Sequence, residues 1–95
     1  MPLYHDHSEE AIRDRDEALR GLAHSFYGSL APSAQAKALH DRSKRFATTC
    51  WRIEAVRAEM PGSYRGTEKE FMWRAFKSGA TMPICERQLR TILSS

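Results

Sequence analysis

The sequence lacks the features of a membrane protein or of a secreted, disulfide-bonded domain. It has only two cysteines, Cys50 and Cys85, whereas short secreted domains usually carry several disulfides. No apolar stretch approaches the roughly 18 residues that a membrane-spanning helix needs. The first residues have neither a cationic lead nor an apolar run. We therefore expect a cytoplasmic protein with no membrane contact, whose two free thiols are small core residues.

Motifs of enzymes and of metal sites are also missing. There is no glycine-rich phosphate loop, no Gly-x-Ser-x-Gly elbow and no pair of carboxylates in an apolar setting. Neither Cys-x-x-Cys nor His-Glu-x-x-His occurs. The cluster His5-Asp6-His7 is more typical of an incidental polar arm than of a metal site. We expect no enzyme activity, no cofactor and no bound metal.

Helical periodicity extends over most of the chain. Apolar residues recur at steps of three and four, which gathers them on one face of a helix. No segment alternates apolar and polar residues long enough for a strand. The first helix is expected to start at a cap on Asp6 or Ser8. The sequence predicts one all-α domain over 1–95, a small irregular or orthogonal bundle of four to five helices with a flexible N-terminal arm at 1–7.

The second predicted helix is long. Ser33 is its expected cap, and its apolar stripe continues to Met60, where Pro61-Gly62 ends it. This pattern favours one continuous helix over 34–60, with a break at 40–43 as the alternative. The expected core-facing residues of the first two helices are Ile12, Leu19, Leu22, Ala23, Phe26, Tyr27 and Leu30, then Ala36, Leu39, Phe46, Ala47, Cys50, Ile53, Val56 and Met60.

Two shorter helices are expected in the last third of the chain. Thr67 and Glu70 have the spacing of a capping box. Gly79 suits the left-handed position after a helix, and Pro83 suits the first turn of the next one. Such a pair over 67–93 resembles a helix-turn-helix in outline. It is also the ordinary way to close a helical bundle.

The helix-turn-helix interpretation assigns nucleic-acid contacts to two sets of side chains. Arginine pairs with guanine and glutamine with adenine in the major groove, and basic side chains bind phosphate. The expected base contacts on the last helix are Arg87, Gln88, Arg90 and Thr91. The expected phosphate contacts are Arg74, Lys77, Lys44 and Arg45.

Charge is distributed unevenly along the chain. Residues 1–31 hold six acidic and three basic side chains, whereas residues 32–95 hold six acidic and 12 basic ones. A basic body suits a polyanionic partner better than a membrane surface. The same distribution fits an acidic first helix that packs beside basic ones.

Three aromatic residues indicate the other class of function. Trp51 and Trp73 lie beside the apolar stripes of their helices, and Tyr64 lies in a loop. A half-exposed tryptophan is a favoured anchor of protein interfaces and also an ordinary residue at the edge of a core. Together on one surface, the three would indicate a protein partner or a homodimer. Two hypotheses therefore remain: a nucleic-acid-binding protein, or an interaction module that acts as an adaptor or inhibitor without nucleic-acid contact.

Overall fold

The computed structural model of the chain describes residues 9–83 and 85–94. Its elements are α1 (Glu9–Phe26), α2 (Pro32–Thr48), α3 (Cys50–Glu54), η2 (Gly62–Tyr64), α4 (Glu68–Lys77) and α5 (Glu86–Leu93). None of the residues it describes lies in a strand, so the predicted all-α bundle is confirmed. The predicted arm at 1–7, the caps Asp6 and Ser8 and the cluster His5-Asp6-His7 lie outside the described residues.

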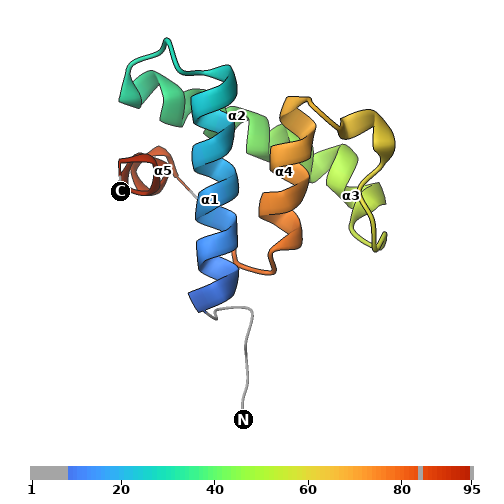
Figure 1. Cartoon of the computed structure of the whole chain (residues 1–95). Helices are drawn as coiled ribbons and strands as arrows, with labels where there is room; N and C mark the ends of the chain where they lie inside the picture. The colour runs from blue at the N-terminus through green and yellow to red at the C-terminus, as the bar shows by residue number, and fades with distance from the viewer. Residues whose placement is uncertain (1–8, 84, 95) are drawn as a thin grey trace.

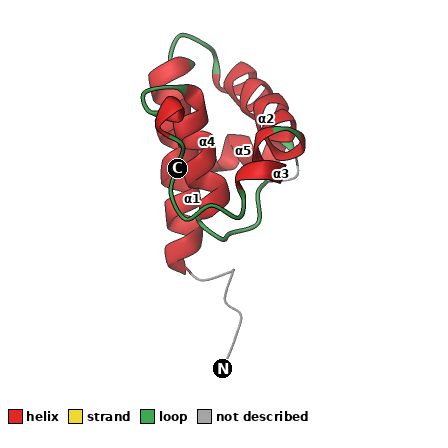
Figure 2. Cartoon of the chain, turned by 90° about the vertical axis from the view of Figure 1, so that its right-hand side faces the viewer, coloured by secondary structure: helices red, strands yellow, loops and turns green. Residues whose placement is uncertain are grey.

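The helices form two layers. α1 and α4 lie side by side and run in opposite directions, and α2 crosses behind them (Figure 1). Figure 2 shows α1 and α4 on one side of the molecule and α2 and α3 on the other. The main packing partner of α4 is α1, whereas α5 packs mainly on α2 and also on α1.

The seam between α1 and α4 depends on a glycine. Gly21 lies in the middle of α1, and a Cβ atom placed there would be 2.8 Å from Cε1 of Phe71 on α4. This separation is too short for two carbon atoms, so only glycine lets the Phe71 ring come this close. At the start of α1, Glu9 and Glu10 place negative charge near the positive end of the helix dipole.

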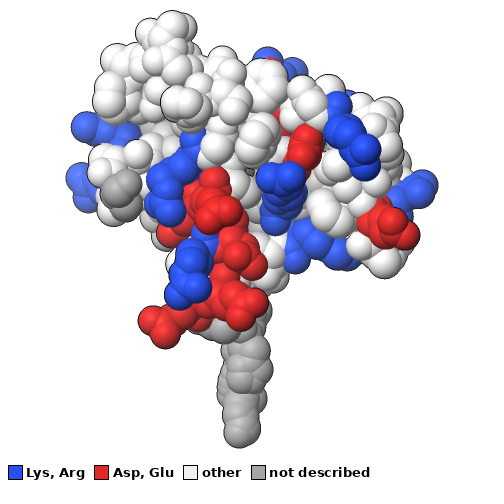
Figure 3. Space-filling model, in the orientation of Figure 1, with Lys and Arg blue, Asp and Glu red and all other residues white. Residues whose placement is uncertain are grey.

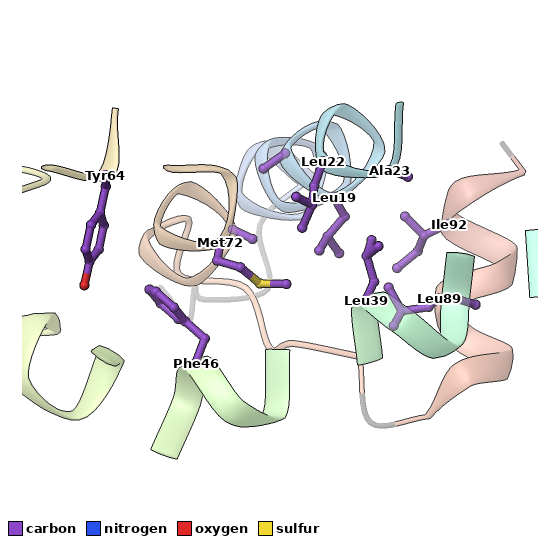
Figure 4. Packing of buried hydrophobic residues seen from close by; sticks show 12 residues of the cluster. Leu19, Leu22, Ala23, Leu39, Phe46, Tyr64, Met72, Leu89 and Ile92 are labelled. Atoms are coloured by element: carbon purple, nitrogen blue, oxygen red, sulfur yellow. The ribbon is translucent and has the colours of Figure 1, made fainter. Parts of the chain in front are cut away.

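Aliphatic side chains fill the region where α1, α2 and α5 meet, which we call the aliphatic end. Leu19, Leu22, Leu39 and Leu89 are each less than 2% exposed. In Figure 4 the residues of the aliphatic end face one another from three helices: Leu19 and Leu22 from α1, Leu39 from α2, and Leu89 and Ile92 from α5. The predicted helical periodicity thus identifies the centre of the core correctly.

The continuous helix predicted over 34–60 is wrong. α2 ends at Thr48, and Thr49 has a ψ of −75° with a φ of −113°, outside regular helix geometry. The hydroxyl of Thr49 donates to the carbonyl of Arg45 at 2.7 Å, and the hydroxyl of Thr48 donates to the same carbonyl at 3.2 Å. Threonine hydroxyls that bond to preceding carbonyls compete with the helical hydrogen-bond pattern and bend helices. The alternative break at 40–43 is also wrong, because these residues are helical.

The break leaves part of the predicted apolar stripe outside the core. Ile53 is 67% exposed and Val56 is 91% exposed. Phe26 and Leu30, predicted on the buried face of the first helix, are 42% and 40% exposed, because α1 ends at Phe26. The stripe of apolar residues therefore overestimates the length of both helices.

Helix ends differ from the predictions in detail. α2 begins with Pro32 after the N-cap residue Ala31, so Ser33 is not the cap. Pro83 precedes α5 instead of lying in its first turn, since α5 begins at Glu86. Cys85, expected in the core, is exposed and serves as the N-cap residue of α5.

The capping signals of α4 are confirmed. Oγ1 of Thr67 accepts a hydrogen bond from the backbone N–H of Lys69 at 3.2 Å. Oε1 of Glu70 accepts from the N–H of Gly66 at 2.7 Å, one residue earlier than in a standard capping box. Gly79 has a φ of +91° and occupies the left-handed position after α4.

Candidate functional site

The C-terminal helices do not form the tight pair that a helix-turn-helix requires. That motif joins its helices by a turn of about three to four residues, whereas α4 ends at Lys77 and α5 begins at Glu86. α4 and α5 lie on opposite sides of α1 in Figure 1, and each has its main packing partner elsewhere. The predicted tight turn at Gly79 is therefore wrong, although the glycine itself ends α4 as expected.

Two of the predicted phosphate contacts are engaged within the protein. Nη2 of Arg74 lies 2.7 Å from a carboxylate oxygen of Glu70, one turn earlier on α4. Nζ of Lys77 donates to the backbone carbonyl of Arg57 at 2.6 Å, and so ties α4 to the segment after α3. These contacts give both side chains a role in holding α4 in place.

The remaining predicted nucleic-acid contacts are exposed, but those of α2 and α5 do not line one common hollow. The four on α5 and the two on α2 are exposed: Arg87, Gln88, Arg90, Thr91, Lys44 and Arg45. Arg87 and Arg90 line a hollow beside Pro32, whereas Arg45 lines a different groove between α2 and α4. Arg74 and Lys77 border a third hollow that also contains acidic side chains of α1.

The surface charge follows the uneven distribution in the sequence. Figure 3 shows acidic side chains gathered over the N-terminal half of α1, whereas the remaining visible face is mostly uncharged, with scattered basic side chains and a few acidic ones. Glu9, Glu10, Asp14 and Glu17 are the exposed acids of this half-helix. The bundle therefore has an acidic corner and a more basic body.

The predicted aromatic residues belong to one cluster, made of Phe46, Trp51, Tyr64, Trp73 and Phe76, which we call the aromatic cluster. The Trp51 ring meets the Trp73 ring edge-on, with centroids 6.4 Å apart. The Tyr64 ring belongs to the cluster through an edge-on contact with the Phe46 ring, with centroids 6.3 Å apart. Both tryptophans are half-buried, but Tyr64 is only 8% exposed. The structure therefore brings Trp51 and Trp73 together near the surface and places Tyr64 in the core.

An open groove lies beside the aromatic cluster, between α2 and the segment formed by η2 and the start of α4. Its volume is about 670 Å³, within the range of about 300–1,000 Å³ typical of ligand sites. Phe26, Phe46, Tyr64 and Met72 contribute apolar surface to it. Its three cations are Arg42, Arg45 and Lys69, and its one carboxylate belongs to Glu68. We call it the α2–α4 groove.

The carboxylate of Glu68 is already partnered inside the protein. The hydroxyl of Tyr27 donates to Oε1 of Glu68, and Nε of Arg42 lies 3.6 Å from the same oxygen. Burial raises the pKa of Tyr27, and the hydrogen bond to Glu68 and the charge of that carboxylate raise the pKa further. Glu68 thus joins the end of α1, the middle of α2 and the start of α4.

Two cations at the groove have no acidic partner in the part of the chain that the structure describes. The side chains of Arg45 and Lys69 are exposed, and no described carboxylate lies within ion-pair distance of either. Nζ of Lys69 lies 5.5 Å from the centroid of the Tyr64 ring. The groove therefore combines apolar walls with a net positive rim.

Most of the groove residues were not predicted as site residues. Arg45 and Tyr64 were predicted, for different functions, whereas Phe26, Glu68 and Lys69 were not. These residues come together only because the chain turns back at η2 and places the start of α4 against α2. The sequence signal that could have indicated this arrangement was the capping box, because it places the start of α4 a few residues after Tyr64.

Comparisons of the chain with models of protein families, with curated proteins and with solved structures return no match. Within residues 9–83 and 85–94, no group of three or more His, Cys, Asp or Glu side chains is placed to hold a metal ion. No helix among those residues combines the length and the apolar character needed to cross a bilayer. Any functional conclusion therefore depends on the side chains themselves.

Proposed function

We propose that this protein is a non-catalytic protein-binding module whose contact surface includes α3 and the α2–α4 groove. The observation that carries the proposal is the exposure of large apolar side chains on one segment. Ile53 and Val56 are 67% and 91% exposed, and the half-buried Trp51 precedes them. Exposed apolar side chains grouped on one surface are typical of protein interaction sites. Half-buried tryptophans are favoured anchors of such sites.

The groove adds to this surface. Cys50, the first residue of α3, lines the groove, so the exposed segment and the groove are neighbours along the chain. The partner is therefore expected to contact an apolar strip on α3 and the residues just after it, and a cationic hollow next to that strip. An adaptor or an inhibitor of a larger complex would use such a surface.

The proposal is tested by co-purification from the native cell with a tagged full-length chain. Replacing both exposed residues (Ile53→Asp with Val56→Asp) should remove a stoichiometric partner, because two charges would be desolvated in the interface. The matched control is Arg87→Ala with Arg90→Ala on α5, which should retain the partner. A wild-type chain recovered without any stoichiometric protein would contradict the proposal. A solution mass equal to two chains, lost in the aspartate variant, would identify the partner as a second copy.

Nucleic-acid binding through α5 is the second candidate function. The exposed side chains of Arg87 and Arg90 favour it, since the α5 face presents two arginines close together. Under this hypothesis the affinity for duplex DNA falls steeply as salt is added, and Arg87→Ala with Arg90→Ala abolishes binding. Affinity that does not change with salt would exclude it.

A cytoplasmic location is part of the proposal. Cys50 and Cys85 are both free thiols in the structure. Free thiols are typical of proteins in reducing compartments. Labelling of these two thiols in freshly lysed cells under non-reducing conditions tests this point.

A further inference from the structure

We propose that the α2–α4 groove binds a segment of the partner protein in which acidic side chains flank one large apolar side chain. This inference rests on the proposed function and names the chemistry of the segment that the groove accepts. It combines three features of the groove: an exposed apolar wall, a rim of cations without acidic partners, and a local carboxylate that is already neutralised.

The apolar wall is the place for the apolar side chain. Phe26 is 42% exposed at the edge of the groove, and its ring packs edge-on against Phe71, with centroids 6.1 Å apart. Phe46 and Met72 continue the wall inward and are almost completely buried. An apolar side chain inserted here would cover the exposed part of Phe26, which no described side chain covers.

The rim is the place for the acidic side chains. Arg45 and Lys69 come from α2 and from α4, and both contribute to the lining of the groove. Ion pairs with exposed cations contribute little singly. Several complementary charges around one hollow nevertheless set which partner binds and how fast it binds. Arg42 also lines the groove, with half of its side chain exposed, but its charge is paired with that of Glu68.

Glu68 would oppose an acidic ligand if its charge were uncompensated. Its carboxylate accepts the Tyr27 hydroxyl and lies 3.6 Å from Arg42. These contacts offset its charge and fix its position. After this pairing, the rim still has Arg45 and Lys69 to receive the carboxylates of a partner. Charge complementarity therefore favours an acidic segment over a basic or neutral one.

The aromatic rings of the groove argue against a single-stranded nucleic acid as the occupant. Proteins that bind single-stranded nucleic acids hold the bases by stacking them on exposed aromatic faces. Tyr64 is only 8% exposed, with Lys69 over its ring and the Phe46 ring against it. Phe46 is only 4% exposed. Phe46 and Tyr64 therefore leave little ring surface for a base, and the well-exposed ring of the groove is that of Phe26, which one apolar side chain can cover.

The test is an NMR titration of the full chain with a short synthetic peptide in which Asp and Glu flank one Phe. We expect saturable shift changes centred on the amides of Arg42, Arg45, Phe46 and Lys69. The double variant Arg45→Glu with Lys69→Glu should weaken the affinity roughly tenfold, as expected for the reversal of two exposed charges. The control Arg87→Glu with Arg90→Glu makes the same charge change on α5 and should leave the affinity unchanged.

Three matched ligands complete the test. A peptide with Lys in place of the acids and a peptide with Ala in place of Phe should each bind at least about tenfold more weakly, equal to about 1.4 kcal/mol. A single-stranded oligonucleotide or a fatty acid that binds the groove more tightly than the acidic peptide overturns the inference. Absence of saturable binding, or shift changes centred on α5, also overturns it.

The two proposals fail separately. If the acidic peptide does not bind, but the aspartate substitutions at Ile53 and Val56 still remove a co-purified partner, only the role of the groove is wrong. If no partner co-purifies while the peptide binds as described, the module as a whole needs another function. Circular dichroism of each variant confirms that the helices are retained, since all of the substituted side chains are exposed.

Discussion

The aliphatic end and the aromatic cluster are both built from apolar side chains but are packed very differently. At the aliphatic end, leucines from α1, α2 and α5 are less than 2% exposed. In the aromatic cluster, Trp51, Trp73 and Phe76 are only half-buried, and the neighbouring Ile53 and Val56 face outward. The aliphatic end thus has the packing of a core, whereas the aromatic cluster has the packing of an incomplete one.

The difference in packing affects the stability of the fold. Complete burial of a leucine-sized side chain stabilises a fold by about 1.5–3 kcal/mol, and exposed apolar surface forgoes this gain. The indole N–H of Trp73 is buried and has no hydrogen-bond partner among the described residues, and such an orphaned group costs about 1–3 kcal/mol. The aromatic cluster is therefore poorly arranged for stability alone. A partner that covers its open side would recover part of the missing burial.

The largest expected effect is on the aliphatic end. Leu39 is 0% exposed between α1 and α5. Leu39→Ala should lower the free energy of unfolding by about 2–5 kcal/mol, because it removes buried methyl groups and leaves a cavity. Urea denaturation of the variant and the wild type measures this difference. A loss below about 1 kcal/mol would mean that the aliphatic end is no better packed than the aromatic cluster.

A smaller loss of stability is expected when a larger side chain, Trp51, is replaced by alanine. Trp51→Ala removes an indole that packs on Phe46, Trp73 and Phe76, yet Trp51 is only half-buried. We expect a loss of about 1–2 kcal/mol, the scale of one or two aromatic pairs. The same denaturation experiment measures it. If Trp51→Ala destabilises the protein more than Leu39→Ala, the comparison between the two regions is reversed.

The aliphatic end was predictable from the sequence because its signal is local. Leu19 and Leu22 on one helix, and Ala36 and Leu39 on the next, recur at helical spacing, and that spacing alone assigns them to buried faces. The cap at Thr67 and the left-handed Gly79 were predictable for the same reason, since each depends on a few neighbouring residues. Fold class and core centre therefore follow from periodicity and capping.

The aromatic cluster was less predictable because its arrangement depends on a helix break that the pattern conceals. Apolar residues continue at helical spacing through Cys50, Ile53 and Val56, and neither Gly nor Pro occurs between Pro32 and Pro61. The break at Thr49 comes from hydroxyl groups that compete for helix carbonyls, an effect that periodicity does not register. The groove is harder still to predict from the sequence, because the residues that line it come from α2 and α4, which lie in distant parts of the chain.

A third prediction concerns the hydrogen bond that ties the groove to α1. Tyr27→Phe removes the hydroxyl that donates to Glu68 and should cost about 1 kcal/mol at neutral pH. The folded-state pKa of Tyr27 is raised above the ordinary value of 10.0. The stability linked to the neutral phenol is therefore fully present below pH 10.0 and is lost as pH rises through the raised pKa.

The advantage of the wild type over Tyr27→Phe should therefore shrink as pH rises above the ordinary tyrosine pKa of about 10. Urea denaturation of both proteins on either side of that pH measures the change, and the difference between them cancels the titration of the other tyrosines. An advantage that stays constant across this range would show that the Tyr27 phenol keeps an ordinary pKa in the folded protein.

The smallest expected effect concerns the side chain that is most exposed. Val56 is 91% exposed beyond the end of α3. Substitutions at such positions usually change stability by no more than about 0.5 kcal/mol in either direction. Val56→Asp should therefore unfold in urea like the wild type while it loses the co-purified partner, because it removes an apolar contact that only the complex uses. A clear loss of stability in the isolated variant would instead place Val56 in the core of the free protein. The aromatic cluster would then be better covered than the exposure of Ile53 and Val56 indicates.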